Sequence, residues 1–180
     1  PDLASNMWRN PGEVPGNGID DDNNGYKDDI YGINAIDDSG DPMDDYGHGT
    51  HVAGIIGARG NNNIGVAGVS WESKIIAAKF LTLDEFGRLS GSSTNAIKAI
   101  NYAIALKRAG RNVTVTNNSW GNTSSTPALA SAVADANTAG ILFVAAAGNN
   151  SSNNDTSPYY PASYTSPNVI SVASIESSTA

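Results

Sequence analysis

Short apolar runs alternate with amphipathic stretches through the second half of the chain. Residues 74–81 and 141–147 are apolar runs typical of buried strands, and residues 113–119 and 169–173 are also strand-like. Between them, residues 92–109 and 127–139 repeat apolar side chains at intervals of three and four positions, which predicts two helices. This alternation predicts a three-layer α/β fold, in which helices cover both faces of a mostly parallel sheet.

The first half of the chain has a different pattern. Residues 8–47 are rich in Gly, Pro, Asp and Asn and show no apolar periodicity, which predicts an extended loop region. The small apolar residues at 52–56 then predict a buried helix that ends near Gly60. Gly54 and Gly57 lie inside that helix although glycine costs about 1 kcal/mol there relative to alanine. We therefore expect a neighbouring backbone in close contact with them.

Composition and charge narrow the classes of protein that fit the chain. Its 180 residues, 39% of them hydrophobic, suffice for one domain with a core. No apolar run approaches the roughly 20 residues of a membrane helix, no signal peptide is visible, and the chain begins at Pro1, which indicates a piece of a longer protein. Ten of the 18 acidic residues lie between Asp20 and Asp45, with Lys27 as the only cation among them, which argues against a nucleic-acid partner. The absence of cysteine excludes disulfides and thiol chemistry.

Both histidines, His48 and His51, lie at the start of the helix predicted over residues 52–56. Their spacing of three could place two metal ligands on one helical face, but no cysteine or following acidic residue completes a zinc site. They could also be merely packed or solvated. The third hypothesis is a general base at His48, where loop meets helix and a side chain can face a cleft.

The sequence Gly-His-Gly-Thr-His-Val-Ala-Gly at residues 47–54 favours the general base. It closely resembles the histidine motif of the subtilisin-like serine peptidases, the subtilases. In that family the first histidine of the motif is the base, which implies this role for His48 and a structural role for His51. The sequence Ala-Ala-Ala-Gly-Asn at residues 145–149 resembles the oxyanion-hole segment of the family, which implies that Asn149 stabilises the oxyanion.

The resemblance covers nearly the whole chain and implies that residues 1–180 are the central part of a subtilase catalytic domain, incomplete at both ends. The family's catalytic aspartate motif would precede Asp2, and its Gly-Thr-Ser-Met-Ala nucleophile motif does not occur in the chain. The resemblance therefore implies a secreted serine endopeptidase with a Ser-His-Asp triad, of which this chain carries only His48 and the oxyanion residue Asn149. We expect the isolated chain to be inactive.

Two functions other than proteolysis are also compatible with an α/β fold. A catalytically inactive calcium-binding or peptide-binding homologue of the same fold is the main alternative, and the presence of both His48 and Asn149 argues against it. A dinucleotide-binding α/β domain would need a glycine fingerprint after the first strand, and the chain has none.

In subtilases the substrate lies as an extra strand between two exposed edges. The resemblance implies that these edges and the pocket for the residue before the cleaved bond are formed by Leu89, Ser90, Gly91, Ser119, Trp120, Gly121, Ala146, Ala147 and Gly148. Trp120 could narrow or floor that pocket, or simply pack. We expect a monomer that binds protein or peptide substrates, with no nucleic-acid and no membrane partner.

The acidic stretch at residues 20–29 contains Asp-x-Asp-x-Asn-Gly, the opening of an EF-hand-type calcium loop. Calcium takes six to eight oxygens, and alternate residues of a turning loop aim theirs inward. Tyr31 stands where an EF-hand has glutamate, so Asp28 or Asp29 would supply that carboxylate. The candidate ligands are Asp20, Asp22, Asn24, Tyr26 and Asp29. The alternative is a solvated acidic loop.

A second calcium loop follows from the resemblance. Residues 60–69 resemble the subtilase loop that wraps a calcium ion with one asparagine side chain and alternate carbonyls. The implied ligands are the side chains of Asn62 and Asp2 and the carbonyls of Gly60, Ile64 and Val66. The acidic residues at 37–45, which have no cation nearby in the sequence, are a less specific candidate. We expect structural Ca²⁺ in a protein that has no disulfide.

Overall fold

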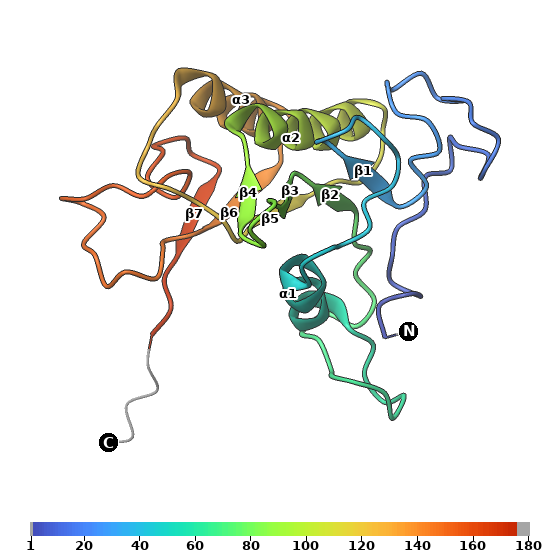
Figure 1. Ribbon diagram of the computed structural model, residues 1–180, viewed down its shortest axis with the longest axis horizontal. Helices are drawn as coiled ribbons and strands as arrows, with labels where there is room; N and C mark the ends of the chain where they lie inside the picture. Colours follow the sequence, from blue (N-terminus) through green and yellow to red (C-terminus); the bar gives the residue numbers. More distant parts are fainter. Residues whose placement is uncertain (1, 176–180) are drawn as a thin grey trace. The chain divides into compact units, whose positions relative to one another are not determined.

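The computed structural model describes residues 2–175, and the chain divides into two compact units, Pro1–Ala99 and Ile100–Ala180 (Figure 1). Each unit contains its own parallel strands. The helix α2 (Ser93–Arg108) begins in the first unit and continues into the second. None of the helices in residues 2–175 combines the length and the apolar character that a membrane span requires.

The first unit is built on a short parallel pair, β1 (Gly32–Asn34) and β2 (Ala77–Lys79), with Ile33 opposite Ala78. Ile33 is fully buried, so this pair supplies part of the core. Gly32 has a φ of 132°, and a Cβ there would lie 1.8 Å from the carbonyl oxygen of Ala77. Only glycine permits this close strand contact.

Two further elements complete the first unit. The strands β3 (Leu81–Leu83) and β4 (Leu89–Gly91) form an antiparallel hairpin with Thr82 opposite Ser90. The helix α1 (His48–Gly57) follows the acidic loop that leaves β1.

The second unit has a three-stranded parallel sheet in the order β5–β6–β7. Its strands are β5 (Val115–Asn118), β6 (Leu142–Ala146) and β7 (Val169–Val172). The helix α3 (Pro127–Thr138) packs against β6. One face of α3, made by Leu129, Ala132, Val133 and Ala136, is buried, as are Phe143 and Ala145 of β6.

The helix ends follow the sequence signals. The Ser92 hydroxyl accepts a hydrogen bond of 3.1 Å from the Asn95 amide at the start of α2. The Thr126 side chain caps α3, which has proline in its first turn. Gly110 and Gly140, with φ of 84° and 73°, follow the two helices in the left-handed region.

The predicted α/β fold with parallel strands is confirmed, together with both amphipathic helices and every predicted strand region. Two predictions about the first half were wrong. Residues 8–47 contain the strand β1. This strand is only three residues long, which is too short to show an alternating apolar pattern in the sequence. The helix α1 is also less buried than its apolar sequence indicates, since Ile55 is 53% exposed and only Gly54 and Gly57 are buried.

Candidate active site

His48 is the first residue of α1, directly after Gly47, whose φ of 96° lies in the left-handed region. The side chains of His48 and His51 are both exposed. The first helical hydrogen bond runs from the His51 amide to the Gly47 carbonyl, at 2.9 Å. His48 therefore presents an accessible imidazole at the point where the loop at residues 35–47 becomes a helix. A general base needs such an accessible position.

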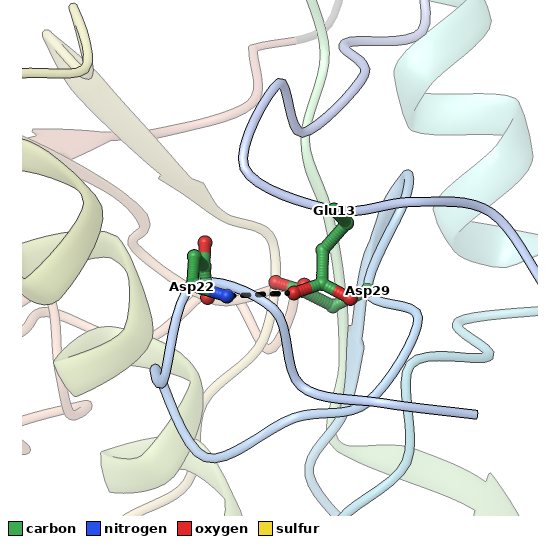
Figure 2. Close-up of side chains that lie close together, drawn as sticks. All are labelled: Glu13, Asp22 and Asp29. Carbon is green, nitrogen blue, oxygen red and sulfur yellow. Dashed lines mark hydrogen bonds between the residues drawn. The ribbon is translucent and has the colours of Figure 1, made fainter. Parts of the chain in front are cut away.

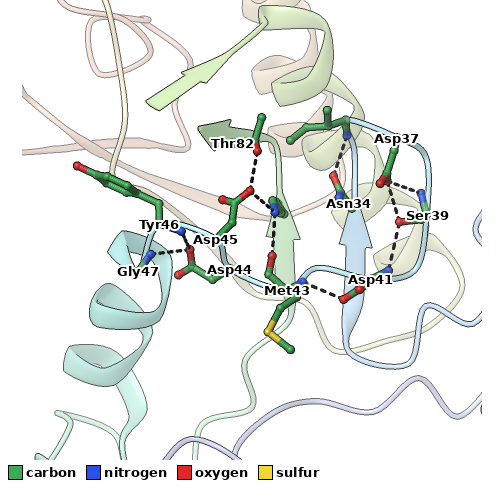
Figure 3. Close-up of polar contacts among 12 residues, drawn as sticks. Asn34, Asp37, Ser39, Asp41, Met43, Asp44, Asp45, Tyr46, Gly47 and Thr82 are labelled. Carbon is green, nitrogen blue, oxygen red and sulfur yellow. Dashed lines mark hydrogen bonds and ion pairs between the residues drawn. The ribbon is translucent and has the colours of Figure 1, made fainter. Parts of the chain in front are cut away.

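The carboxylate of Asp44 binds the first turn of α1 (Figure 3). Its Oδ1 accepts from the amides of Tyr46 and Gly47 at 2.9 and 2.8 Å. Its Oδ2 accepts from the Thr50 amide at 2.9 Å and from the Thr50 hydroxyl at 2.6 Å. Partial burial raises the pKa of Asp44, but these hydrogen bonds outweigh it and hold the pKa well below its usual range.

The neighbouring Asp45 turns the other way, toward the strands. Its Oδ2 accepts from the Lys79 ammonium at 3.0 Å and from the Thr82 hydroxyl at 2.6 Å (Figure 3). Lys79 also donates to the Met43 carbonyl at 2.8 Å. The hydrogen bonds from Thr82 and Lys79 lower the pKa of Asp45. Asp45 thus joins the loop at residues 35–47 to β2 and β3, while Asp44 joins the same loop to α1.

The interpretation of residues 37–45 as a cluster without cations was wrong. Lys79 binds Asp45, and Lys98 of α2 forms an ion pair with Asp38. Both lysines come from elements far along the chain, so sequence proximity could not reveal them. Asp37 and Asp41 accept local hydrogen bonds, from Ser39 and from the Met43 amide (Figure 3).

The far end of α1 is held by Asn6, which is 3% exposed. Its side-chain amide donates to the carbonyls of Gly57 and Trp71, at 2.8 and 2.6 Å. Residues 68–70 donate three backbone hydrogen bonds to carbonyls between Ile55 and Ala58. A Cβ at Gly57 would lie 3.1 Å from the Ile75 side chain and 3.4 Å from the Ser70 carbonyl oxygen, and a Cβ at Gly54 would lie 3.8 Å from the Val66 side chain. The nearest neighbour of both glycines is therefore a side chain and not the expected backbone.

The second candidate catalytic residue, Asn149, follows β6 in the second unit and is exposed. The segment before it is fixed by two hydrogen bonds, from the Ala147 amide to the Val172 carbonyl and from the Asn154 side chain to the Ala147 carbonyl, at 2.8 and 2.9 Å. Gly148 has a φ of 104°. Asn149 therefore lies just beyond the carboxyl end of a parallel strand, where ligands bind in such sheets.

The expected substrate-binding segments lie at strand ends and edges. Leu89, Ser90 and Gly91 form β4, and all three are exposed. Ser119, Trp120 and Gly121 follow β5 and are half-buried. Ala146 ends β6 and Ala147 and Gly148 follow it. The exposed edge of a two-stranded hairpin can pair with an extended peptide through backbone hydrogen bonds.

Within the second unit, Tyr159 contacts two of these segments, at Gly121 and at Gly148. Its hydroxyl donates to the Gly121 carbonyl at 2.7 Å. A Cβ at Gly148 would lie 3.2 Å from its ring, and one at Gly121 would lie 2.4 Å from it. Tyr159 was not predicted as part of the site, because no local pattern links it to Gly121, which lies 38 residues before it.

The loop at residues 60–67 closes on Asp2. The Asp2 Oδ1 accepts from the Asn62 side chain at 2.7 Å, and its Oδ2 accepts from the Val66 amide at 2.9 Å. The bonds from Asn62 and Val66 lower the pKa of Asp2. A hollow of about 330 Å³ is lined by residues 60–67, which include Gly60 and Ile64. Four of the five implied ligands therefore lie in the loop at residues 60–67, and the fifth, Asp2, is hydrogen-bonded to that loop.

Three carboxylates meet in the acidic loop before β1, from Glu13, Asp22 and Asp29 (Figure 2). One oxygen of each lies within 4.8 Å of the others. Asp29 is fully buried and Glu13 is 7% exposed. The Asn10 side chain donates to both Asp22 and Asp29, at 2.9 and 3.0 Å. Sequence reasoning missed Glu13, because it precedes the Asp-rich motif by seven residues or more.

The remaining acidic-loop candidates have other contacts. Asp20 accepts from the amides of Asn24 and Gly25, at 3.0 and 2.9 Å, and so closes the turn. Asn24 accepts from the Tyr26 amide and donates to Asp29 at 2.9 Å. Asp28 accepts from the amides of three residues, Gly16, Asn17 and Gly18. Asp22 and Asp29 are thus brought together, whereas Asp20 and Asp28 serve as turn acceptors.

The chain matches the model described as the subtilase family over residues 1–180. It is 43% identical to subtilisin-like protease 1 of Plasmodium berghei (strain Anka) over 150 residues, which are 83% of this chain and 24% of that protein. It is 38% identical to the minor extracellular protease Epr of Bacillus subtilis (strain 168), over 75% of this chain and 19% of Epr. The chain thus spans about a quarter or less of the length of these relatives.

Two solved structures of proteases are also similar to this chain. The S41 psychrophilic protease matches 75% of this chain with 41% of its own, at a TM-score of 0.66 and 34% identity. Sphericase matches 75% of this chain with 42% of its own, at a TM-score of 0.65 and 36% identity.

Proposed function

The chain belongs to the subtilase family, and from this premise we propose that the whole protein is a secreted serine endopeptidase with His48 as its general base. The observation that carries the proposal is the placement of an exposed His48 at the first turn of α1, within the motif at residues 47–54. His48 takes the proton from the nucleophilic serine hydroxyl and later gives it to the leaving amine. The serine, and the aspartate that orients His48, belong to the rest of the protein.

Asn149 has the second catalytic role. Its side-chain amide donates to the oxyanion that forms when the serine attacks the peptide carbonyl. The rigid segment that precedes it supports this assignment, because an oxyanion donor must be fixed before the reaction. Losing one such donor costs about 10²–10³ in kcat, a magnitude established on subtilisin itself.

A protein or peptide substrate binds as an extended strand along Leu89, Ser90 and Gly91 of β4 and along the segments that follow β5 and β6. The exposure of β4 supports this mode, since its outer edge offers backbone donors and acceptors. The relative Epr is named an extracellular protease, which supports secretion of the protein to which this chain belongs. We infer a monomer without nucleic-acid or membrane partners.

We propose structural calcium at two loops of the first unit. At residues 60–66 the donor set is a carboxylate, an asparagine oxygen and backbone carbonyls, all of which suit calcium. Exchanging the nitrogen and oxygen of the Asn62 amide would turn its oxygen toward Asp2, so that both face one cation, at the loss of the bond that this oxygen accepts from the Ile64 amide. In the acidic loop, Asp22 and Asp29 are joined by Glu13, and three carboxylates in a largely buried place repel one another until a divalent ion neutralises them.

The test of the catalytic proposal is the His48→Ala variant of the full-length protein, with His51→Ala as the matched loss of an exposed imidazole from α1. We expect His48→Ala to fold and to lose turnover by more than about a hundredfold, an ordinary effect for a general base. His51→Ala should keep turnover. Substantial hydrolysis of a peptide substrate by His48→Ala would refute the assignment.

A further inference from the structure

We propose that Asp44 is the positioning residue of His48: its carboxylate fixes the first turn of α1 and so sets the direction in which the imidazole projects. This proposal rests on the proposed role of His48 as the base. It concerns a residue that lies outside the motif at residues 47–54 and that the resemblance does not assign to catalysis.

The first turn of α1 needs an external acceptor. The first amides of any helix have no partner inside it, and a side chain at the N-cap position usually accepts from them. In α1 the N-cap residue is Gly47, which has no side chain to do so. Asp44 takes over this role from three residues upstream, with both carboxylate oxygens in use.

The hydrogen bonds of Asp44 enclose His48 on both sides along the chain. Tyr46 and Gly47 precede it, and Thr50 follows it by two positions. Because one rigid carboxylate plane holds all three, the backbone that carries His48 cannot rotate without breaking at least one of these bonds. A negative charge at this end of α1 is also favourable for the helix dipole.

Packing does not fix the His48 ring in this unit, since the residue is exposed. Within this unit the direction of the ring therefore depends on the backbone of the first turn, and the triad aspartate of the rest of the protein can bind the imidazole only if that turn aims it correctly. Misplacing a catalytic group by about 1 Å can cost about 100-fold in rate. A contact that restrains this turn consequently acts on the rate constant, even though it touches no substrate.

The ionised form of Asp44 is the one that suits this role. Burial raises its pKa, yet the bonds from Thr50, Gly47 and Tyr46 keep it ionised well below the ordinary range of a carboxyl group. An ionised carboxylate only accepts hydrogen bonds, which matches the four donors around it. Asparagine at this position would turn a donating amide toward at least one of those donors.

The experiment compares Asp44→Asn with Asp41→Asn in the full-length enzyme. Asp41 is the matched control, because it lies in the same loop and accepts a local backbone bond, from Met43, but has no bond to α1. A fluorophosphonate titrates the active serines, so that kcat is expressed per active site, and KM is measured with the same peptide substrate. This separates slower chemistry from a smaller folded fraction.

We expect Asp44→Asn to lower kcat per active site by about 10- to 100-fold, with KM nearly unchanged. Asp41→Asn should match the wild type. Thr50→Val removes only the hydroxyl bond to Asp44 and should lower kcat less, while Thr50→Ser, which keeps a hydroxyl, should restore it.

Two results would overturn the proposal while leaving the peptidase function intact. One is an unchanged kcat per site in Asp44→Asn. The other is a loss of titratable sites alone, which would give Asp44 a role in folding only. A wild-type enzyme that neither hydrolyses peptides nor reacts with the fluorophosphonate would instead refute the proposed function itself.

Discussion

Asn6→Ala should weaken the first unit more than the loss of one small polar side chain suggests. The Asn6 amide donates two hydrogen bonds, one to the carbonyl that ends α1, of Gly57, and one to that of Trp71. The first is buried and the second is part-buried. Each hydrogen bond contributes about 0.5–1.5 kcal/mol net, and a buried partner left unsatisfied costs more. We therefore expect the free energy of unfolding to fall by about 2 kcal/mol.

The assay is urea unfolding of the full-length protein, followed by tryptophan fluorescence, with a covalent serine-peptidase inhibitor present to prevent self-digestion. Asn101→Ala is the matched control, because Asn101 is exposed on α2, and it should change the free energy by less than about 0.5 kcal/mol. Asn6→Asp sharpens the test. It keeps the shape but turns carboxylate oxygens toward both carbonyls, so it should destabilise more than Asn6→Ala. An Asn6→Asp variant as stable as the wild type would refute the role of the amide as a donor.

Three further predictions concern acid, calcium and the isolated chain. Hydrogen bonds lower the pKa of Asp44 in the folded state below its ordinary 3.8. The ionised Asp44 therefore stabilises the fold fully above that value, and this contribution is lost as the pH falls through the lower folded value. In urea unfolding, the Asp44→Asn variant should therefore lose less stability on acidification than the wild type. Chelation with EDTA should lower the melting temperature of the full-length protein, and Asp22→Asn or Asn62→Ala should remove part of that difference, whereas magnesium should substitute poorly for calcium; coincident melts with EDTA and with calcium would refute the calcium proposal. The 180-residue chain alone should neither cleave casein nor react with a fluorophosphonate at a serine.

Periodicity predicted the second unit well because its elements carry their own signals. The helix α3 has a proline in its first turn, four buried residues on one face and Gly140 after it. The strand β6 is apolar along its whole length. Such features depend on neighbours within a few residues, so a single sequence contains them.

The first unit was harder because long-range contacts determine it. The strand β1 is only three residues long and exists by pairing with β2, which lies more than forty residues later. Lys79 and Lys98 neutralise carboxylates to which no local pattern links them. Glu13 joins Asp22 and Asp29 only after the loop has folded. Of the arrangement around His48, the motif indicated the proposed base but not the residues that contact its helix.

A signal for Asp44 did exist in the sequence. It is a carboxylate three residues before a glycine that cannot cap a helix, followed by a threonine at the third position after that glycine. Because that glycine has no side chain to cap the helix, the nearest upstream acceptor is expected to do so.

The helix α1 is bound at both ends by polar side chains from outside the helix. Its apolar burial is small, since Gly54 and Gly57 are its only buried residues. Its two ends are instead tied by polar contacts, by Asp44 at the start and by Asn6 at Gly57. Within the part of the protein that the structure describes, hydrogen bonds at its two ends are therefore the main contacts that fix α1. The position of His48 should therefore depend more on these two polar residues than on any apolar contact of α1.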